Sequence, residues 1–229
     1  MGRPLRVSLG GYVYHALNRG NGRSVIFHKD GDYEAFERIL VESLDHVPGM
    51  RLLCYCLMPN HWHLVLWPRR DGELSDFMHW LTLTHTQRWH AHYHDAGCGH
   101  LYQGRFKSLP VQEDEHLLSM CRYVERNALR AGLVGKAQAW RWSSLWQRQQ
   151  EETKRSVRLS AGPMAWPAGW LKHVNEPQTE AELEAVRRCI ARGQPLGSAT
   201  WSKRTATRLG LMSTLRRRGR PKKSTTKGS

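Results

Sequence analysis

Residues 51–67 constrain the fold more than any other part of the chain, because they contain two short apolar runs separated by Pro59-Asn60. Each run has the length and the bounding turn residues of a β-strand. Two strands joined by so tight a connection form an antiparallel hairpin. We therefore expect strands at 51–58 and 61–67, within an antiparallel sheet.

The second strand begins with the sequence His61-Trp62-His63. Residues i and i+2 of a strand share a face, so both imidazoles point to one side and Trp62 points to the other. Two neutral imidazoles side by side can bind one divalent metal ion. An isolated His-x-His pair is also typical of a polar sheet surface, so the pair alone leaves both interpretations open.

The flanking sequence predicts a fold around this hairpin. Helical periodicity begins near Asp32 and ends at Pro48-Gly49. The order of elements is βαββαβ followed by a helix, which is typical of an α+β, ferredoxin-like (RRM-like) antiparallel sheet with helices on one face. Besides the hairpin, we expect strands at 12–18 and 105–111 and helices at 74–93 and 114–131.

The pattern becomes weaker after residue 147, and we divide the chain there. Residues 1–147 are expected to form the sheet domain, and residues 148–212 a C-terminal helical extension with helices at 179–192 and 200–211. Residues 213–229 are expected to be a basic, disordered tail.

Charge points to a polyanionic partner. The chain of 229 residues has a formal net charge of +15, and residues 201–229 contain ten Lys or Arg and no acid, which leaves +5 for the rest. Nucleic acid is the first candidate.

There is no apolar run long enough for a bilayer and no signal-peptide core. The five cysteines, including Cys54 and Cys56, have no disulfide or zinc spacing, so we expect buried thiols in a cytoplasmic, nucleoid-associated protein.

Tyr123 and Asn127 stand four residues apart on the helix predicted at 114–131. Residues at this spacing lie one above the other, so a phenol and an amide oxygen could face one point in space. A tyrosine on a helix is usually a packed aromatic, and this alternative stays open from spacing alone.

Several motifs occur together in one order, and together they resemble the REP-associated tyrosine transposases, which belong to the single-tyrosine HUH superfamily. The resemblance spans about residues 4–147. One departure is Ala128, where the family usually has proline. The motifs are Met58-Pro59-Asn60-His61-Trp62-His63-Leu64, Gln103-Gly104-Arg105-Phe106, Arg122-Tyr123-Val124-Glu125-Arg126-Asn127 and Trp142-Ser143-Ser144.

The resemblance implies roles for these residues. Tyr123 would be the nucleophile that attacks a DNA phosphate and forms a 5′-phosphotyrosine link. His61, His63 and Asn127 would bind Mg²⁺ or Mn²⁺. The partner would be single-stranded or hairpin DNA, and the protein would act as a monomer or a homodimer.

Basic residues near these motifs are candidates for DNA binding. Arg19 and Arg23 belong to a glycine-rich loop, and Arg105 and Lys107 lie on the strand predicted at 105–111. The tail resembles an AT-hook, which would place arginines in the minor groove of AT-rich duplex DNA, although a basic tail of general affinity is an alternative. Its candidate contacts are Arg218, Arg220 and Lys222.

Three functions are compatible with the sequence. The first is a metal-dependent endonuclease and strand transferase acting on hairpin DNA. The second is a domesticated DNA-binding protein without catalysis, and the third is a ferredoxin-like RNA-binding domain with stacking aromatics. His61, His63, Tyr123 and Asn127 together favour the first function, because a protein that only binds DNA does not need all four.

Overall fold

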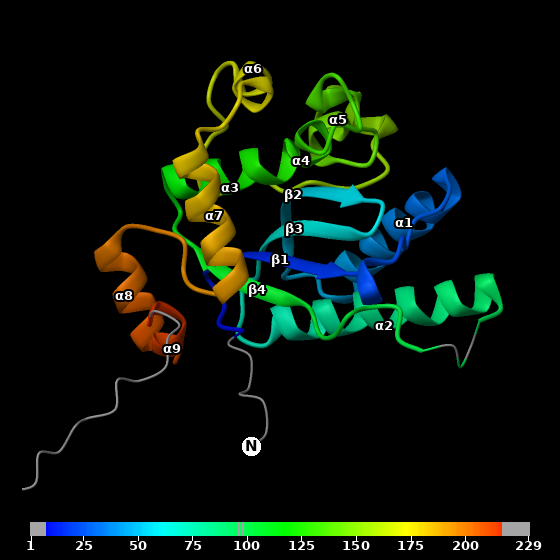
Figure 1. The fold of residues 1–229 in the computed structure, drawn as a ribbon, viewed down its shortest axis with the longest axis horizontal. Helices are drawn as coiled ribbons and strands as arrows, with labels where there is room; N and C mark the ends of the chain where they lie inside the picture. The colour runs from blue at the N-terminus through cyan, green and yellow to red at the C-terminus, as the bar shows by residue number, and fades with distance from the viewer. Residues whose placement is uncertain (1–7, 96, 98, 217–229) are drawn as a thin grey trace, which may run out of the picture.

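The hairpin predicted at 51–67 is present and forms half of a four-stranded antiparallel sheet. The computed structural model describes residues 8–95, 97 and 99–216 (Figure 1). The strand order is β2-β3-β1-β4, as expected for a ferredoxin-like sheet. The strands are β1 (Val13–Arg19), β2 (Arg51–Met58), β3 (His61–Trp67) and β4 (Lys107–Val111).

Two long helices cover one face of this sheet, α1 (Asp30–His46) and α2 (Glu73–Tyr93). They bury the face that carries Trp62, whose side chain is fully buried and donates from Nε1 to the hydroxyl of Tyr102 at 3.0 Å. The direction predicted for Trp62 is therefore confirmed. The predicted fold class, a ferredoxin-like sheet with its crossover helices on one face, is confirmed as well.

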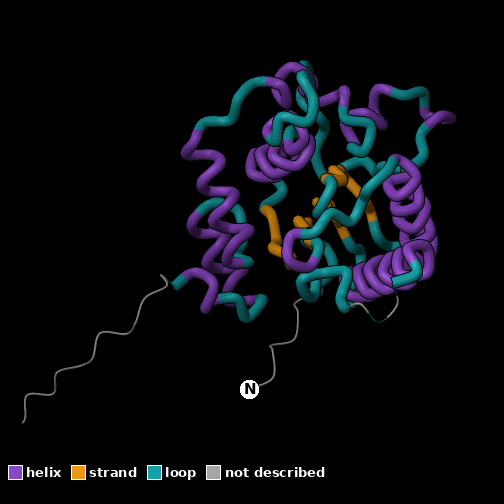
Figure 2. Tube along the Cα trace, turned by 45° about the vertical axis from the view of Figure 1, so that its right-hand side comes forward, coloured by secondary structure: helices purple, strands orange, loops and turns teal. Residues whose placement is uncertain are grey.

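The C-terminal helices pack on the other face and along the β4 side of the sheet (Figures 1 and 2). Short 3₁₀ turns lie at Asn21–Arg23, Ala137–Ala139 and Glu152–Lys154. The helices are α3 (Glu115–Glu125), α4 (Asn127–Arg130), α5 (Ser144–Gln149), α6 (Trp170–Asn175), α7 (Glu180–Arg192), α8 (Ala199–Arg208) and α9 (Met212–Leu215).

Some boundaries differ from the sequence prediction. The helix expected at 114–131 is interrupted at Arg126, where ψ is −2°. The strand expected at 105–111 begins at Lys107, so Arg105 lies in the preceding loop, and the helix expected at 200–211 ends at Arg208, just before Gly210 with φ +66°. Arg218, Arg220 and Lys222 lie outside the described residues, and the domain division at 147 and 212 stays a prediction.

The expectation of buried thiols is borne out. Cys54 and Cys56 are fully buried on β2, and burial raises the pKa of the Cys56 thiol to about 12. Within the described residues, each helix is too short or too polar to cross a bilayer.

Candidate metal and nucleophile site

Strand alternation gathers a set of polar side chains on the face that α3 covers. In the β1–β3 pairing, Arg19 is opposite His61 and Leu17 is opposite His63. In the β1–β4 pairing, Leu17 is opposite Lys107. Side chains directly opposite one another in an antiparallel pair share a face. Arg19, His61, His63 and Lys107 therefore lie on one side of the sheet, as the sequence predicted for the two histidines.

The His61 ring is held by the hairpin turn before it. Its Nδ1 lies 2.6 Å from the side-chain oxygen of Asn60, and the Asn60 amide group donates to the carbonyl of Arg23 at 3.1 Å. An amide oxygen only accepts, so the His61 Nδ1 carries the hydrogen and its Nε2 keeps a free lone pair. Burial, with Arg19 and Arg130 nearby, lowers the pKa of His61 to about 4, so this ring is neutral at pH 7.

His63 is paired with a second histidine that sequence analysis did not select. Its Nδ1 lies 2.8 Å from Nε2 of His15, and the two rings are stacked with centroids 5.0 Å apart. Burial lowers the pKa of His63 well below its usual range and that of His15 to about 3. The sequence could have identified His15 as a site residue, because alternation along the strand places it on the same face as Arg19 and the His-x-His pair.

Tyr123 projects from α3 toward these histidines. Its ring meets the ring of His63 edge to face, with centroids 5.9 Å apart, and its side chain is 9% exposed. The guanidinium of Arg130 lies over the Tyr123 ring, with Cζ 4.1 Å from the centroid. The structure thus brings the predicted nucleophile and the histidine strand together within one chain, and adds Arg130, which sequence analysis missed.

Asn127 is buried beside Tyr123. Its Oδ1 accepts from Nη2 of Arg130 at 2.7 Å, while its Nδ2 is buried with no partner among the described residues. An amide oxygen has two lone pairs, so one remains for a further ligand. Arg130 thereby links the tyrosine ring to the proposed metal-binding amide.

A buried carboxylate anchors α3 close to Tyr123. Glu125 is 0% exposed and accepts from Ser144 Oγ at 2.6 Å, from Trp170 Nε1 at 2.7 Å and from Arg148. Ser144 belongs to the Trp142-Ser143-Ser144 motif and also bonds the backbone of Tyr55 on β2. The motif therefore ties the tyrosine helix to the sheet, and Ser143 caps α5.

Two arginines on either side of Tyr123 attach α3 to the extension. Arg122 donates to the carbonyls of Glu176 and Pro177 at 2.8 and 3.1 Å. Arg126 donates to the carbonyl of Val174 at 3.0 Å and to that of Asn175. The backbone break at Arg126 thus lies where the extension binds the helix.

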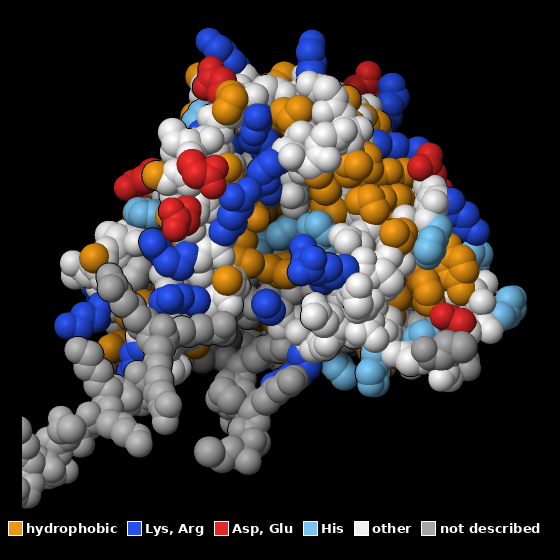
Figure 3. All heavy atoms as spheres, viewed as in Figure 1, with side chains coloured by type: hydrophobic (Ala, Val, Ile, Leu, Met, Phe, Trp, Pro, Cys, Tyr) orange, Lys and Arg blue, Asp and Glu red, His pale blue; other side chains and the backbone are white. Residues whose placement is uncertain are grey.

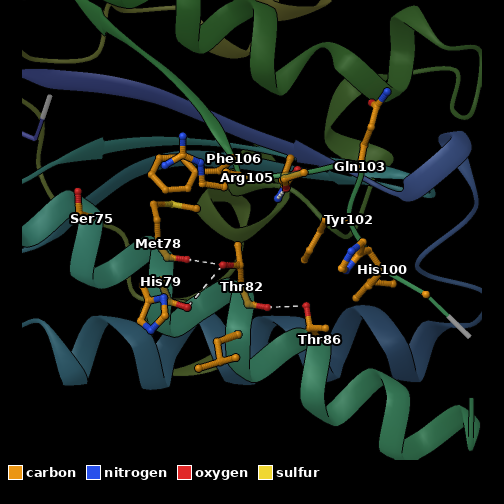
Figure 4. A pocket seen from close by; sticks show the side chains of 15 residues that line it. Ser75, Met78, His79, Thr82, Thr86, His100, Tyr102, Gln103, Arg105 and Phe106 are labelled. Carbon is orange, nitrogen blue, oxygen red and sulfur yellow. Dashed lines mark hydrogen bonds between the residues drawn. The ribbon is translucent and has the colours of Figure 1, made fainter. Parts of the chain in front are cut away.

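The predicted DNA-binding residues occupy two regions. Arg19 is half-buried beside His61, and its Nε has no partner among the described residues; Arg23 and Lys107 are exposed. Figure 3 shows histidine side chains in the middle of this face of the molecule, bordered by Lys and Arg. Arg105 instead lines a groove of about 700 Å³ between α2 and the loop before β4 (Figure 4).

The donor set at the site fits a hard or borderline divalent ion. It offers an Nε2 lone pair from His61, a second imidazole from His63 and an amide oxygen from Asn127. The Asn127 Nδ2 is an N–H donor without an acceptor among the described residues, so an anionic group such as a phosphate, and not the cation, would satisfy it. A separate group, Asp114 with Glu115 and His116, lies at the start of α3, where Asp114 caps the helix.

Comparison with known proteins finds a matching family model and solved structures that resemble this one. The family model described as IS200-like transposase matches residues 8–127. A solved REP-associated tyrosine transposase bound to a REP hairpin aligns with 79% of this chain and 100% of its own, at 14% identity and a TM-score of 0.50. A putative transposase from Deinococcus radiodurans R1 covers 56% of this chain and 95% of its own, at 20% identity and a TM-score of 0.39. No curated protein matches.

Proposed function

Because the chain belongs to the family of IS200-like transposases, we propose that it cleaves and rejoins single-stranded DNA through Tyr123. The observation that carries this proposal is the edge-to-face contact between Tyr123 and His63, which joins a tyrosine to the His-x-His strand within one chain. The proposed site is complete in a single protomer, so we propose cleavage by a monomer.

In the proposed reaction the Tyr123 hydroxyl attacks a DNA phosphorus, and the bond from phosphorus to the 3′ oxygen breaks. The phenol loses its proton, and the departing 3′ oxygen gains one. The products are a 5′-phosphotyrosine and a free 3′-OH. The reverse attack by a 3′-OH reseals a strand without a nucleotide cofactor, which is the basis of strand transfer.

His61, His63 and Asn127 are the proposed ligands of Mg²⁺ or Mn²⁺. A bound divalent ion would polarise the scissile phosphate and offset its developing charge. The chain itself supplies placement, since the hairpin turn holds His61 and the anchored helix holds Tyr123. Arg130, over the Tyr123 ring, would offset the negative charge that develops on the phenol oxygen during attack.

We propose hairpin DNA as the substrate, since the solved transposase with a similar fold is bound to a REP hairpin. Arg19 supports this, because its guanidinium lies beside His61 with a buried Nε that has no partner in the described part of the chain, and guanidinium groups bind phosphate well. Lys107 and Arg23 would contact neighbouring phosphates, and Arg105 would contact DNA beyond the cleavage position. Tail binding to AT-rich duplex DNA stays a prediction.

The test is formation of a covalent protein–DNA adduct. The protein is incubated with a single-stranded oligonucleotide that contains a REP-type hairpin, in Mg²⁺ or Mn²⁺, and run on a denaturing gel. Wild type and Tyr12→Phe, changed at a half-buried tyrosine away from the site, should form the adduct, whereas Tyr123→Phe should not. An adduct with Tyr123→Phe would disprove the nucleophile assignment.

The alternative function is a DNA-binding protein without catalysis. It would bind the hairpin but form no adduct with either metal. If wild type forms the adduct, His61→Ala separates catalysis from binding, because this variant should lose the adduct while it still binds the hairpin.

A further inference from the structure

His15 is a buried histidine without an assigned role. It lies in the middle of β1 and is 0% exposed. Its Nε2 lies 2.8 Å from the Nδ1 of His63, and its other ring nitrogen, Nδ1, is buried with no partner among the described residues. Within the part of the chain that the structure describes, the ring therefore makes one side-chain hydrogen bond, to a proposed metal ligand.

The position of one hydrogen decides whether His63 can bind a cation. The Nδ1 of His63 faces His15, so only Nε2 is available to a metal. A neutral imidazole that binds through Nε2 carries its hydrogen on Nδ1. In that form His63 donates to His15, and the hydrogen of His15 must lie on its own Nδ1. If His15 donated instead, the His63 Nε2 would be protonated and unable to bind.

The other proposed histidine ligand, His61, also has its Nδ1 hydrogen-bonded to a side chain, and there the direction of the hydrogen bond is unambiguous. The Nδ1 of His61 faces the Asn60 side-chain oxygen at 2.6 Å, which can only accept. Both proposed ligands thus have Nδ1 occupied by a second side chain and Nε2 left for a ligand. Hydrogen bonds of this kind fix the ring orientation and tautomer of metal-binding histidines.

We propose that His15 is a positioning residue that accepts the Nδ1–H of His63 and so keeps the His63 Nε2 free to bind a divalent cation. This inference rests on the metal site of the proposed function. A purely structural role, in which His15 only fills space beneath α3, predicts no effect on metal affinity once the chain is folded.

The test is Mn²⁺ affinity of the full chain, measured by the electron paramagnetic resonance signal of free Mn²⁺ without DNA. His15→Phe keeps a ring but removes the acceptor, and should weaken Mn²⁺ binding by about 10- to 100-fold, the usual effect of losing an outer hydrogen-bond partner. His15→Leu serves the same purpose if the larger ring disturbs packing. His15→Gln places an amide oxygen near the lost Nε2 and should restore most of the affinity.

His85→Gln is the matched control, because His85 on α2 is also buried and hydrogen-bonded, to Tyr102, on the opposite side of the sheet from His15. It should leave Mn²⁺ affinity unchanged. Unchanged affinity in folded His15→Phe or His15→Leu would overturn the inference and leave the proposed function standing, as would a Gln variant as weak as Phe. Failure of the wild type to bind Mn²⁺ would overturn both the inference and the proposed metal site.

Discussion

The guanidinium carbon of Arg130 lies 4.1 Å from the ring centroid of Tyr123, and the same group donates to the Tyr123 carbonyl at 3.2 Å. A guanidinium held against the ring can offset the negative charge that develops on the phenol oxygen during attack. Arg130 also donates to Asn127 Oδ1, so it orders two of the proposed site residues at once.

We therefore expect Arg130→Gln to slow adduct formation by about 100-fold, the scale for loss of one preorganised donor. Arg130→Lys should lie between Gln and wild type, because an ammonium keeps the charge but loses the planar fork. The measurement is the single-turnover rate of adduct formation on hairpin DNA. Equal rates for wild type and Arg130→Gln would show that Arg130 does not act at the site.

The buried Glu125 should be essential for the stability of the layer that carries Tyr123. Removing its carboxylate leaves the mostly buried Arg148 without its partner, and breaking a buried ion pair in this way costs about 3–5 kcal/mol. We expect Glu125→Ala to lower the free energy of unfolding by this amount in urea denaturation. Glu42→Ala is the control, because the Glu42–Arg88 pair is 41% and 53% exposed and should contribute less than about 1 kcal/mol. Similar losses of unfolding free energy in both variants would show that the buried Glu125 network stabilises the chain no more than an exposed ion pair does.

Acid should destabilise the chain partly through His85. Burial lowers the pKa of this histidine to about 3 from 6.5, so below pH 6.5 the unfolded chain binds a proton that the folded chain does not. Stability must then fall as the pH drops from 6.5 toward 3, by up to about 1.4 kcal/mol per pH unit for this group.

His85→Gln removes this titration, although it also weakens the contact with Tyr102. We expect a lower free energy of unfolding at pH 7 but a shallower decline between pH 6.5 and 4.5, measured by urea denaturation in EDTA. A decline as steep as that of wild type would show that His85 titrates normally.

Much of the fold could be predicted because period-2 alternation and one tight turn determine the sheet. His61 and His63 share a face whatever surrounds them, and Tyr123 and Asn127 lie on one helix face at a spacing of four. The partners of these residues could not be predicted in the same way. His15 on β1 meets His63 on the neighbouring strand β3 diagonally, a contact that depends on the pairing and register of strands 48 residues apart. Glu125 meets residues 19 and 45 positions away, and these contacts depend on how layers pack. Local periodicity contains neither kind of information.

Arg105 shows how a boundary error changes an interpretation. Its sequence neighbours alternate as a strand would, yet pairing with β1 begins at Lys107 and Leu17. Before that point the chain is not part of the β1–β4 ladder, although the Gln103 N–H donates to the carbonyl of Arg19 at the end of β1. Arg105 is thereby moved from the sheet to the groove beside α2.

The basic side of α8 should bind DNA phosphates away from the cleavage site. Lys203, Arg204 and Arg208 are exposed on this helix, and the sequence has no acidic residue after Glu184 to neutralise them. Each phosphate contact adds about 0.7 to 0.9 to the slope of log affinity against log salt. Changing all three residues to Ala should reduce the slope of hairpin binding by about 2, while the cleavage rate at saturating DNA stays constant.

The matched control removes three arginines that are already paired with acids on α1. Arg88, Arg141 and Arg158 bind Glu42, Glu34 and Asp45 at 2.8 to 3.0 Å. Changing these three to Ala alters the net charge of the protein by the same amount, so an effect of overall charge alone would reduce the slope equally in both triple variants. A larger reduction for the α8 variant assigns the contacts to that helix, because within the described residues its three charges have no acidic partner whereas the three control arginines do.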